Sequence, residues 1–120
     1  MIPVAVYKGM LDKKKRSKYG AVKTKVDGIN FDSKLEAAAY LVLQEAVKEK
    51  RIKYFLRQVP IPLPGGVTYR ADFTLFYHDG RVRYLDFKGM VTAGFIVKHK
   101  IVEALYPIEI ELFKSTKDFL

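Results

Sequence analysis

Residues 69–77 read YRADFTLFY, residues 78–80 read HDG, and residues 81–89 read RVRYLDFKG. Aromatic and β-branched residues fill both arms, and Asp-Gly is a strong turn signal, so this stretch predicts a β-hairpin. At the end of the hairpin remote from the turn lie three charged residues, namely Asp72, Asp86 and Lys88. Two carboxylates and a lysine at one end of a hairpin form a candidate site for a metal ion and a phosphate.

The length of the turn decides whether the two aspartates meet. A two-residue turn would place Asp72 opposite Phe87, and the two carboxylates would then point to opposite faces. A three-residue loop over residues 78–80, with Gly80 in the left-handed conformation, would place Asp72 opposite Asp86. Because only an odd-length loop or a bulge brings the carboxylates together, we expect the three-residue loop.

The composition restricts the class of protein. A chain of 120 residues, 49% of them apolar, is long enough for one domain with a single core. There is no cysteine, which excludes disulfides and thiolate metal sites. The longest apolar run, residues 37–43, is far shorter than the roughly 20 residues that span a bilayer, and the N-terminus lacks the pattern of a signal peptide. We therefore expect a cytoplasmic protein with no membrane partner.

The net charge of +9 is concentrated near the N-terminus. Residues 1–25 carry eight Lys or Arg and one acid, giving +7, whereas residues 26–120 carry fourteen basic and twelve acidic residues, giving +2. We interpret residues 1–18 as a basic arm and residues 19–120 as a single domain. Such arms commonly bind the nucleic-acid backbone, and a solubilising tail or a patch for anionic lipids is the alternative. The candidate contacts of the arm are Lys13, Lys14, Lys15, Arg16 and Lys18.

Turn and capping signals predict the elements before the hairpin. Residues 21–29 contain an Asp-Gly pair and predict a small hairpin. A helix is expected from Ser33 to about residue 50, because Ser33 can cap it and Glu36 completes a capping-box pattern. Residues 52–63 predict a strand, and its two prolines favour the edge of a sheet.

After the hairpin, Thr92 can begin a second helix over residues 93–106, and residues 108–113 alternate as a final strand. The apolar side of this helix is expected to comprise Ile96, Val97, Ile101, Val102 and Leu105. The strand–helix–strand step requires parallel pairing between the second hairpin arm and the final strand. The order of elements predicts an α/β fold, with a mixed β-sheet flanked by two helices.

Asp72, thirteen intervening residues and then Asp86-Phe87-Lys88 resemble the signature of the PD-(D/E)XK nuclease superfamily. The expected order of elements is similar to its restriction-endonuclease-like core, which carries the signature on the second and third strands. Ala71 stands where the superfamily name has proline, at a position that varies. Other segments resemble a small phage-encoded branch that is generally treated as nucleases, often as Holliday-junction-resolvase-like ones. These segments are Tyr19-Gly20 and residues 26–29, 31–37, 71–73 and 86–89, so that the resemblance covers about residues 18–113.

The resemblance implies a Mg²⁺-dependent DNA endonuclease, with Mn²⁺ able to substitute, that acts on branched DNA such as Holliday junctions. It also implies a homodimer, located in the host cytoplasm if a phage encodes the protein. The implied catalytic residues are Asp72, Asp86, Lys88 and Glu36. The implied metal ligands are Asp72, Asp86, the backbone carbonyl of Phe87 and Glu36. Gln58 is implied to point into the site, and Lys98 and Lys100 to contact substrate phosphate.

Each of these residues also has a structural interpretation. The alternatives are a capping box for Glu36, a surface pair for Asp86 and Lys88, a strand end for Asp72, a backbone hydrogen bond for Gln58 and a solvated helix face for Lys98 and Lys100. One site at one edge of the sheet explains the acids and Lys88 more economically than separate roles do. For the whole protein, the alternatives are a non-catalytic nucleic-acid-binding domain and a phage protein whose arm contacts an acidic partner.

Overall fold

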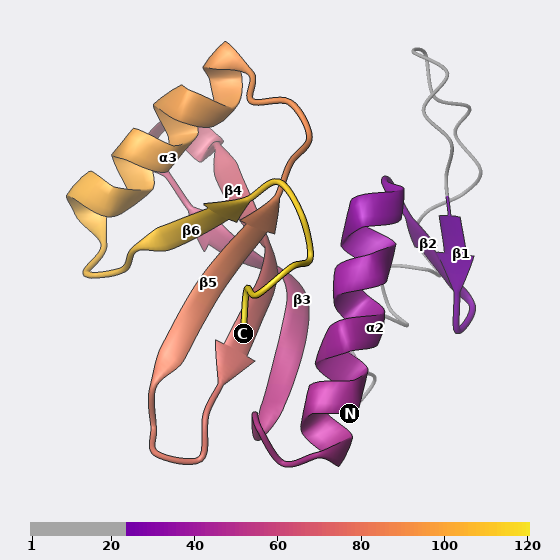
Figure 1. Ribbon diagram of the computed structural model, residues 1–120. Helices are drawn as coiled ribbons and strands as arrows, with labels where there is room; N and C mark the ends of the chain where they lie inside the picture. The colour runs from indigo at the N-terminus through magenta and orange to yellow at the C-terminus, as the bar shows by residue number, and fades with distance from the viewer. Residues whose placement is uncertain (1–23) are drawn as a thin grey trace.

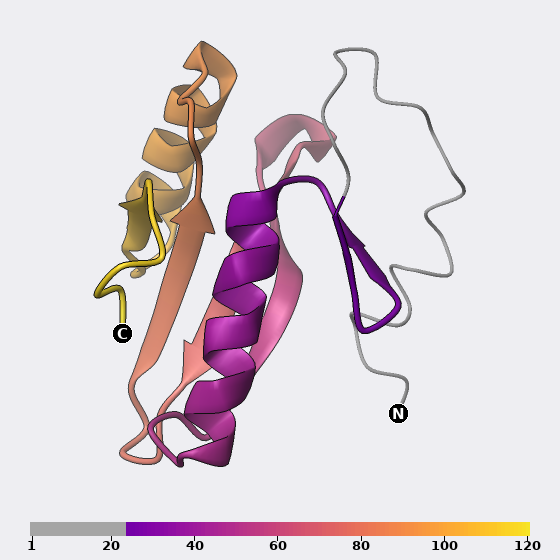
Figure 2. The same cartoon turned by 45° about the vertical axis from the view of Figure 1, so that its right-hand side comes forward.

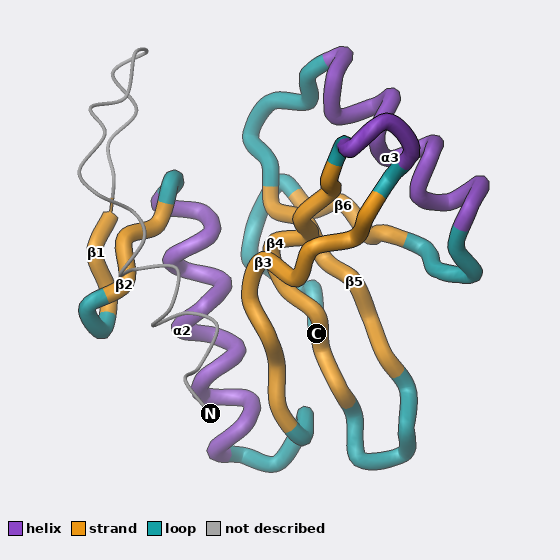
Figure 3. Tube along the Cα trace, turned by 180° about the vertical axis from the view of Figure 1, so that it is seen from behind, coloured by secondary structure: helices purple, strands orange, loops and turns teal. Residues whose placement is uncertain are grey.

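A mixed β-sheet with a helix on each side forms the body of the protein, of which the computed structural model describes residues 24–120 (Figure 1). Its strands, in spatial order, are β3 (Tyr54–Pro62), β4 (Thr68–Phe76), β5 (Val82–Phe87) and β6 (Ile110–Phe113). The first three pair antiparallel, and β6 pairs parallel to β5 as the strand–helix–strand step predicted. The helices are α2 (Lys34–Lys48) and α3 (Ala93–Leu105), which lie on opposite sides of the sheet when it is viewed from behind (Figure 3).

This arrangement confirms the predicted α/β class and is compatible with a restriction-endonuclease-like core. Strand β3 lies at the sheet edge, as its prolines predicted, and the 3-10 turn η1 (Pro64–Gly66) connects it to β4. Within residues 24–120, no helix is long and apolar enough to cross a membrane. The basic residues of the arm (Lys13, Lys14, Lys15, Arg16 and Lys18) and Tyr19-Gly20 lie outside the described residues.

A small hairpin precedes α2, as the sequence predicted, although its second arm extends to Phe31. Its strands are β1 (Thr24–Val26) and β2 (Ile29–Phe31). Asp27 and Gly28 make the turn with φ angles of 52° and 77°, which is the left-handed conformation that two-residue hairpin turns need. Ile29 and Phe31 belong to the same apolar core as the buried side chains of α2, and the hairpin lies alongside α2 (Figure 2).

Helix α2 begins where the capping residue predicted, because Ser33 Oγ accepts the backbone N–H of Glu36 at 3.1 Å. Its buried side chains contact the inner face of the sheet and form a core that we call the α2 core. The main members of this core are Phe31, Ala39, Leu43, Ala46, Phe73, Leu75, Leu85 and Phe87. The buried face of α2 also carries Glu36 toward the sheet.

Helix α3 begins at its predicted cap, Thr92, whose Oγ1 accepts the N–H of Phe95 at 3.1 Å. The predicted apolar side of this helix is wrong in part. Val102 is fully buried, but Ile96, Val97 and Leu105 are 45%, 56% and 55% exposed. The helix instead packs through Phe95, Ile101, Val102 and Tyr106 into a second core, the α3 core, with Ile61, Leu63, Tyr69, Ala71 and Ile110. Phe95 near the start of α3 and Tyr106 just after its end are both partly buried against this core.

The β4–β5 hairpin has the three-residue loop that the sequence predicted. Tyr77 donates its N–H to the carbonyl of Arg81 at 2.9 Å, and Gly80 adopts a φ of 92°. The ladder runs from the Phe76–Val82 pair to the Phe73–Leu85 pair. One register step further, Asp72 lies opposite Asp86.

The residues of strand β4 before and after Asp72 pack into different cores. Phe73 belongs to the α2 core, whereas Ala71 belongs to the α3 core. On the neighbouring strand, Gln58 stands opposite Asp72 and has a φ of 54°, in the left-handed region that non-glycine residues rarely adopt. The chain therefore buries an acidic residue between two apolar cores, beside a strained backbone position.

Candidate functional site

Two hydrogen bonds link Asp72 to Asp86 and Phe87 just beyond the last paired residues of β4 and β5. The backbone N–H of Asp72 donates to Asp86 Oδ1 at 3.0 Å, and the N–H of Phe87 donates to Asp72 Oδ2 at 2.8 Å. Only 7% of Asp72 and 1% of Asp86 is exposed. Asp86 Oδ2 accepts no hydrogen bond from any residue in the described range 24–120. A buried, unpartnered carboxylate oxygen beside a second carboxylate is suited to bind a cation.

A third acid, Glu36, reaches the same place from α2. Its Oε1 accepts hydrogen bonds from Arg57 Nη2 at 3.3 Å and from Gln58 Nε2 at 3.1 Å. Gln58 Nε2 also donates to Asp72 Oδ1 at 3.2 Å, so one amide group connects the two acids. The side chain of Glu36 therefore accepts hydrogen bonds from β3. Of the predicted capping box, the described residues contain the hydrogen bond that Ser33 accepts.

Burial raises the pKa of all three carboxyl groups because it removes water from their charged forms. For Glu36 the pKa rises to about 7, since the charge of Asp72 adds to burial and Arg57 offsets only part of it. For Asp86 it rises to about 6, although the hydrogen bond from Asp72 and the charge of Lys88 oppose the shift. For Asp72 the direction is the same. Burial therefore disfavours the charged forms of the three acids, and a cation bound beside them would stabilise those forms.

Two of the three acids, Glu36 and Asp72, line a cavity of about 470 Å³ together with Gln58 and Lys88, whereas Asp86 lies behind its wall. Arg70 also lines this cavity, on the approach to Asp72. The predicted site residues of the acidic cluster are thus brought together, and Gln58 contacts it directly. Phe87 joins the cluster through its backbone N–H.

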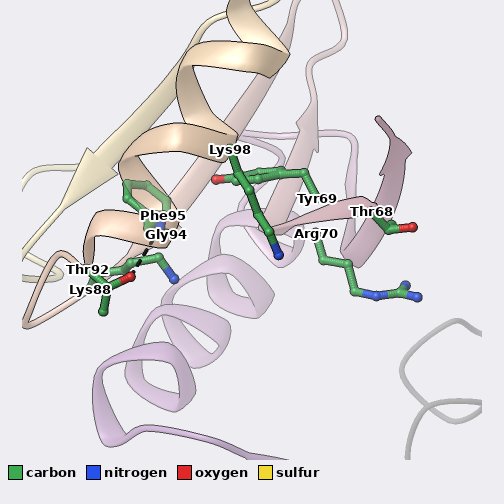
Figure 4. A pocket seen from close by; sticks show the side chains of 8 residues that line it. All are labelled: Thr68, Tyr69, Arg70, Lys88, Thr92, Gly94, Phe95 and Lys98. Atoms are coloured by element: carbon green, nitrogen blue, oxygen red, sulfur yellow. Dashed lines mark hydrogen bonds between the residues drawn. The ribbon is translucent and has the colours of Figure 1, made fainter. Parts of the chain in front are cut away.

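A second cavity of about 520 Å³ adjoins the first, and Arg70 and Lys88 line both (Figure 4). Figure 4 shows Lys98 between Lys88 and Thr92 on one side of the cavity and Arg70 on the other. Lys88 Nζ lies 4.9 Å from the centre of the Phe95 ring. Among the described residues, those lining this cavity include three basic side chains and no acidic one, so it is suited to bind an anion.

The structure distinguishes two lysines that the sequence analysis treated alike, and it shows two site residues that the sequence analysis did not predict. Lys98 lines the basic cavity, whereas Lys100 is exposed and does not line it. Arg57 and Arg70 were not predicted as site residues. Arg57 had no sequence signal, because its partner Glu36 lies 21 residues away on another element. Arg70 did have a sequence signal. It precedes Asp72 by two residues, and residues two apart on a strand point to the same face of the sheet.

The fold and the site define an α/β protein with three buried acids and an adjoining basic cavity at one end of a mixed sheet. No group of three Asp, Glu, His or Cys side chains in residues 24–120 is arranged as a ready metal-binding cluster. The chain belongs to the family described as "Protein of unknown function (DUF1064)", whose model matches residues 16–118. Comparisons with curated proteins and with solved structures give no match.

Proposed function

We propose that this protein is a metal-dependent DNA endonuclease of the PD-(D/E)XK type that hydrolyses phosphodiester bonds in branched DNA. The observation that carries the proposal is the buried Asp72–Asp86 pair, in which Asp72 lines the same cavity as Lys88. The order of strands and the position of the pair on β4 and β5 agree with the resemblance of the sequence to that superfamily.

The residues present fit a divalent ion such as Mg²⁺ or Mn²⁺. Asp86 Oδ2 has no hydrogen-bond partner among residues 24–120, and burial disfavours the charged form of this carboxyl group, which a bound cation would stabilise. Asp72 and Asp86 would hold the ion, and the resemblance adds the backbone carbonyl of Phe87 and Glu36. When bound, such an ion polarises a phosphate oxygen and lowers the pKa of a coordinated water.

The protein's own groups supply the remaining requirements of the reaction. Lys88 stands between the acidic and the basic cavity, where its ammonium group can orient the attacking water or stabilise negative charge that develops on the phosphate. Gln58 holds Glu36 and Asp72 in place through its amide. Burial of the acids keeps bulk water from the reacting groups.

The basic cavity supports nucleic acid as the substrate. Arg70 and Lys98 would bind the phosphate backbone next to the bond that is cut, because both line a cavity that adjoins the acids. The basic arm of residues 1–18 would add further, sequence-independent contacts. Resolving a four-way junction takes two cuts, so we propose a homodimer with two sites.

Cleavage of a synthetic four-way junction in Mg²⁺ tests the proposal. Asp72→Ala, Asp86→Ala and Lys88→Ala should each lower the cleavage rate by about 100-fold or more. All three should still bind the junction in a gel-shift assay. The control is Asp79→Ala, because Asp79 is an exposed acid at the other end of the same hairpin and pairs with Arg81. Undiminished cutting by the three site variants would contradict the assignment.

A second candidate function is a non-catalytic nucleic-acid-binding domain that keeps this fold. It is favoured by the pairing of Glu36 with Arg57 and by the absence of a ready three-acid cluster in residues 24–120. The two functions differ in one measurable property. A binding domain would retain affinity for DNA and show no turnover with any divalent ion.

A further inference from the structure

The space between Glu36 and Asp72 is filled by groups of strand β3. Gln58 Nε2 lies 3.1 Å from Glu36 Oε1 and 3.2 Å from Asp72 Oδ1. Both ionised carboxylates can only accept hydrogen bonds, so the donor between them must be the amide nitrogen. An ion bridging these two acids would have to displace that amide.

Arg57 donates to the same oxygen of Glu36 as Gln58 does. Its Nη2 lies 3.3 Å from Glu36 Oε1, and only 3% of the Arg57 side chain and 7% of the Glu36 side chain are exposed. The guanidinium stacks over the ring of Phe31 at 4.3 Å. Nε and Nη1 of Arg57 have no hydrogen-bond partner within the described part of the chain. A buried guanidinium stays charged, so Glu36 has a permanent positive neighbour inside the protein.

Neither aspartate forms such an ion pair with a described residue, although Lys88 lies near both and Arg57 near Asp72. Asp72 and Asp86 are bound mainly by backbone N–H groups, and Lys88 is directed over the ring of Phe95. Asp86 Oδ2 is the buried carboxylate oxygen that has no partner in residues 24–120. A cation would therefore find a buried, unpartnered carboxylate oxygen at Asp86, whereas Glu36 already has a cation in contact.

We propose that Arg57, with the Gln58 amide, occupies the place of a second cation, so that the site binds one divalent ion through Asp72 and Asp86 and leaves Glu36 outside its coordination. Arg57 is then a positioning residue that acts through Glu36. This inference rests on the proposed metal-dependent function and adds the number of ions and the role of Glu36.

Titration of the full-length chain with Mn²⁺, followed by electron paramagnetic resonance of the free ion, tests the inference without any measurement of activity. The wild type should bind one ion per chain, and Asp86→Asn should bind none. Glu36→Gln should still bind one ion, with an affinity loss no greater than the roughly 10–100-fold that is typical when a hydrogen-bonded neighbour of a metal ligand is removed. Glu45→Gln, an exposed acid on the same helix, is the matched control.

Variants of Arg57 test its part in the same titration. Arg57→Met should bind two ions, because Glu36 loses its internal cation, and the double variant Arg57→Met/Glu36→Gln should return to one. If Arg57→Met does not fold, the Glu36→Gln titration still decides the matter. Two ions in the wild type, or no detectable ion in Glu36→Gln, would overturn the inference and leave the proposed function intact. No ion in the wild type would contradict the proposed function itself.

Discussion

Asp86 is a proposed metal ligand whose burial lowers the stability of the metal-free protein. It is 1% exposed, one of its oxygens has no partner within residues 24–120, and burial raises its pKa from 3.8 to about 6. A carboxyl whose pKa is higher in the folded state contributes stability below its unfolded pKa, and this contribution is lost as the pH rises through the folded value. Between about pH 4 and about pH 6, ionisation of Asp86 therefore destabilises the metal-free protein.

Substitution of Asp86 by asparagine should stabilise the protein at high pH. The side-chain oxygen of the introduced asparagine could still accept the N–H of Asp72, and the buried charge would be gone. Without divalent ions, the free energy of unfolding at about pH 8 should rise by on the order of 2–3 kcal/mol, and the gain should vanish near about pH 4. Urea unfolding at both pH values measures it. Asp79→Asn on the exposed loop should show no such gain, and an Asp86→Asn protein that is no more stable at the higher pH would contradict this account.

At the scale of single elements, helix α3 differs most from its sequence pattern. The aliphatic residues at 96, 97 and 105 suggested a buried stripe, but the buried line runs through Phe95, Val102 and Tyr106. Hydrophobic periodicity identifies a helix and not the neighbour that its side chains meet. The Tyr106 hydroxyl donates to the carbonyl of Pro62 at 2.6 Å, a contact 44 residues apart that no local pattern reveals.

Paired alanine substitutions test which side of α3 is buried. Val102→Ala should lower the free energy of unfolding by about 2 kcal/mol, because it opens a cavity in the α3 core. Val97→Ala should change it by less than about 0.5 kcal/mol, because Val97 is 56% exposed. Chemical denaturation of both variants gives the comparison, and equal losses would indicate that the apolar stripe is buried after all.

The β4–β5 hairpin shows what local sequence does determine. Asp79-Gly80, the alternating arms and the need to bring two acids together were enough to predict the loop length and the register. Ser33 likewise predicted the start of α2. These features depend on residues within a few positions of one another, whereas the pairing of Glu36 with Arg57 depends on the packed fold.

Gly80→Ala tests the loop independently of the site. The φ of 92° is unfavourable for a residue with a Cβ, so the variant should be about 1–2 kcal/mol less stable. Its Mn²⁺ affinity should match the wild type, because the loop lies at the end of the hairpin remote from Asp72 and Asp86. Thermal unfolding and a Mn²⁺ titration measure the two effects, and unchanged stability would contradict the left-handed assignment.

At the scale of the whole molecule, two apolar cores meet at Asp72, and two cavities of opposite character meet at Arg70 and Lys88. The sequence indicated the acids through their spacing and the helices through their caps. It did not distinguish Lys98 from Lys100, because two lysines on the same helix look alike until the helix is docked. The basic cavity is thus a property of the assembled fold.

The difference between these lysines can be measured by DNA binding. Lys98→Ala should weaken binding of a four-way junction and reduce the slope of log affinity against log salt by about 1, since it removes one phosphate contact. Lys100→Ala should change neither quantity appreciably, because Lys100 does not line the cavity. Fluorescence anisotropy at several salt concentrations gives both values, and equal effects of the two substitutions would contradict the proposed path of the substrate.

The most direct test of the central claim is a cleavage assay with a panel of substrates: four-way junction, flap, duplex and single strand. The wild-type protein is incubated with each in Mg²⁺, in Mn²⁺ and in excess EDTA. The account predicts cutting of the junction with either ion, none in EDTA and none by Asp86→Asn in Mg²⁺. Intact substrates under every condition, or cutting that persists in EDTA or in Asp86→Asn, would contradict it.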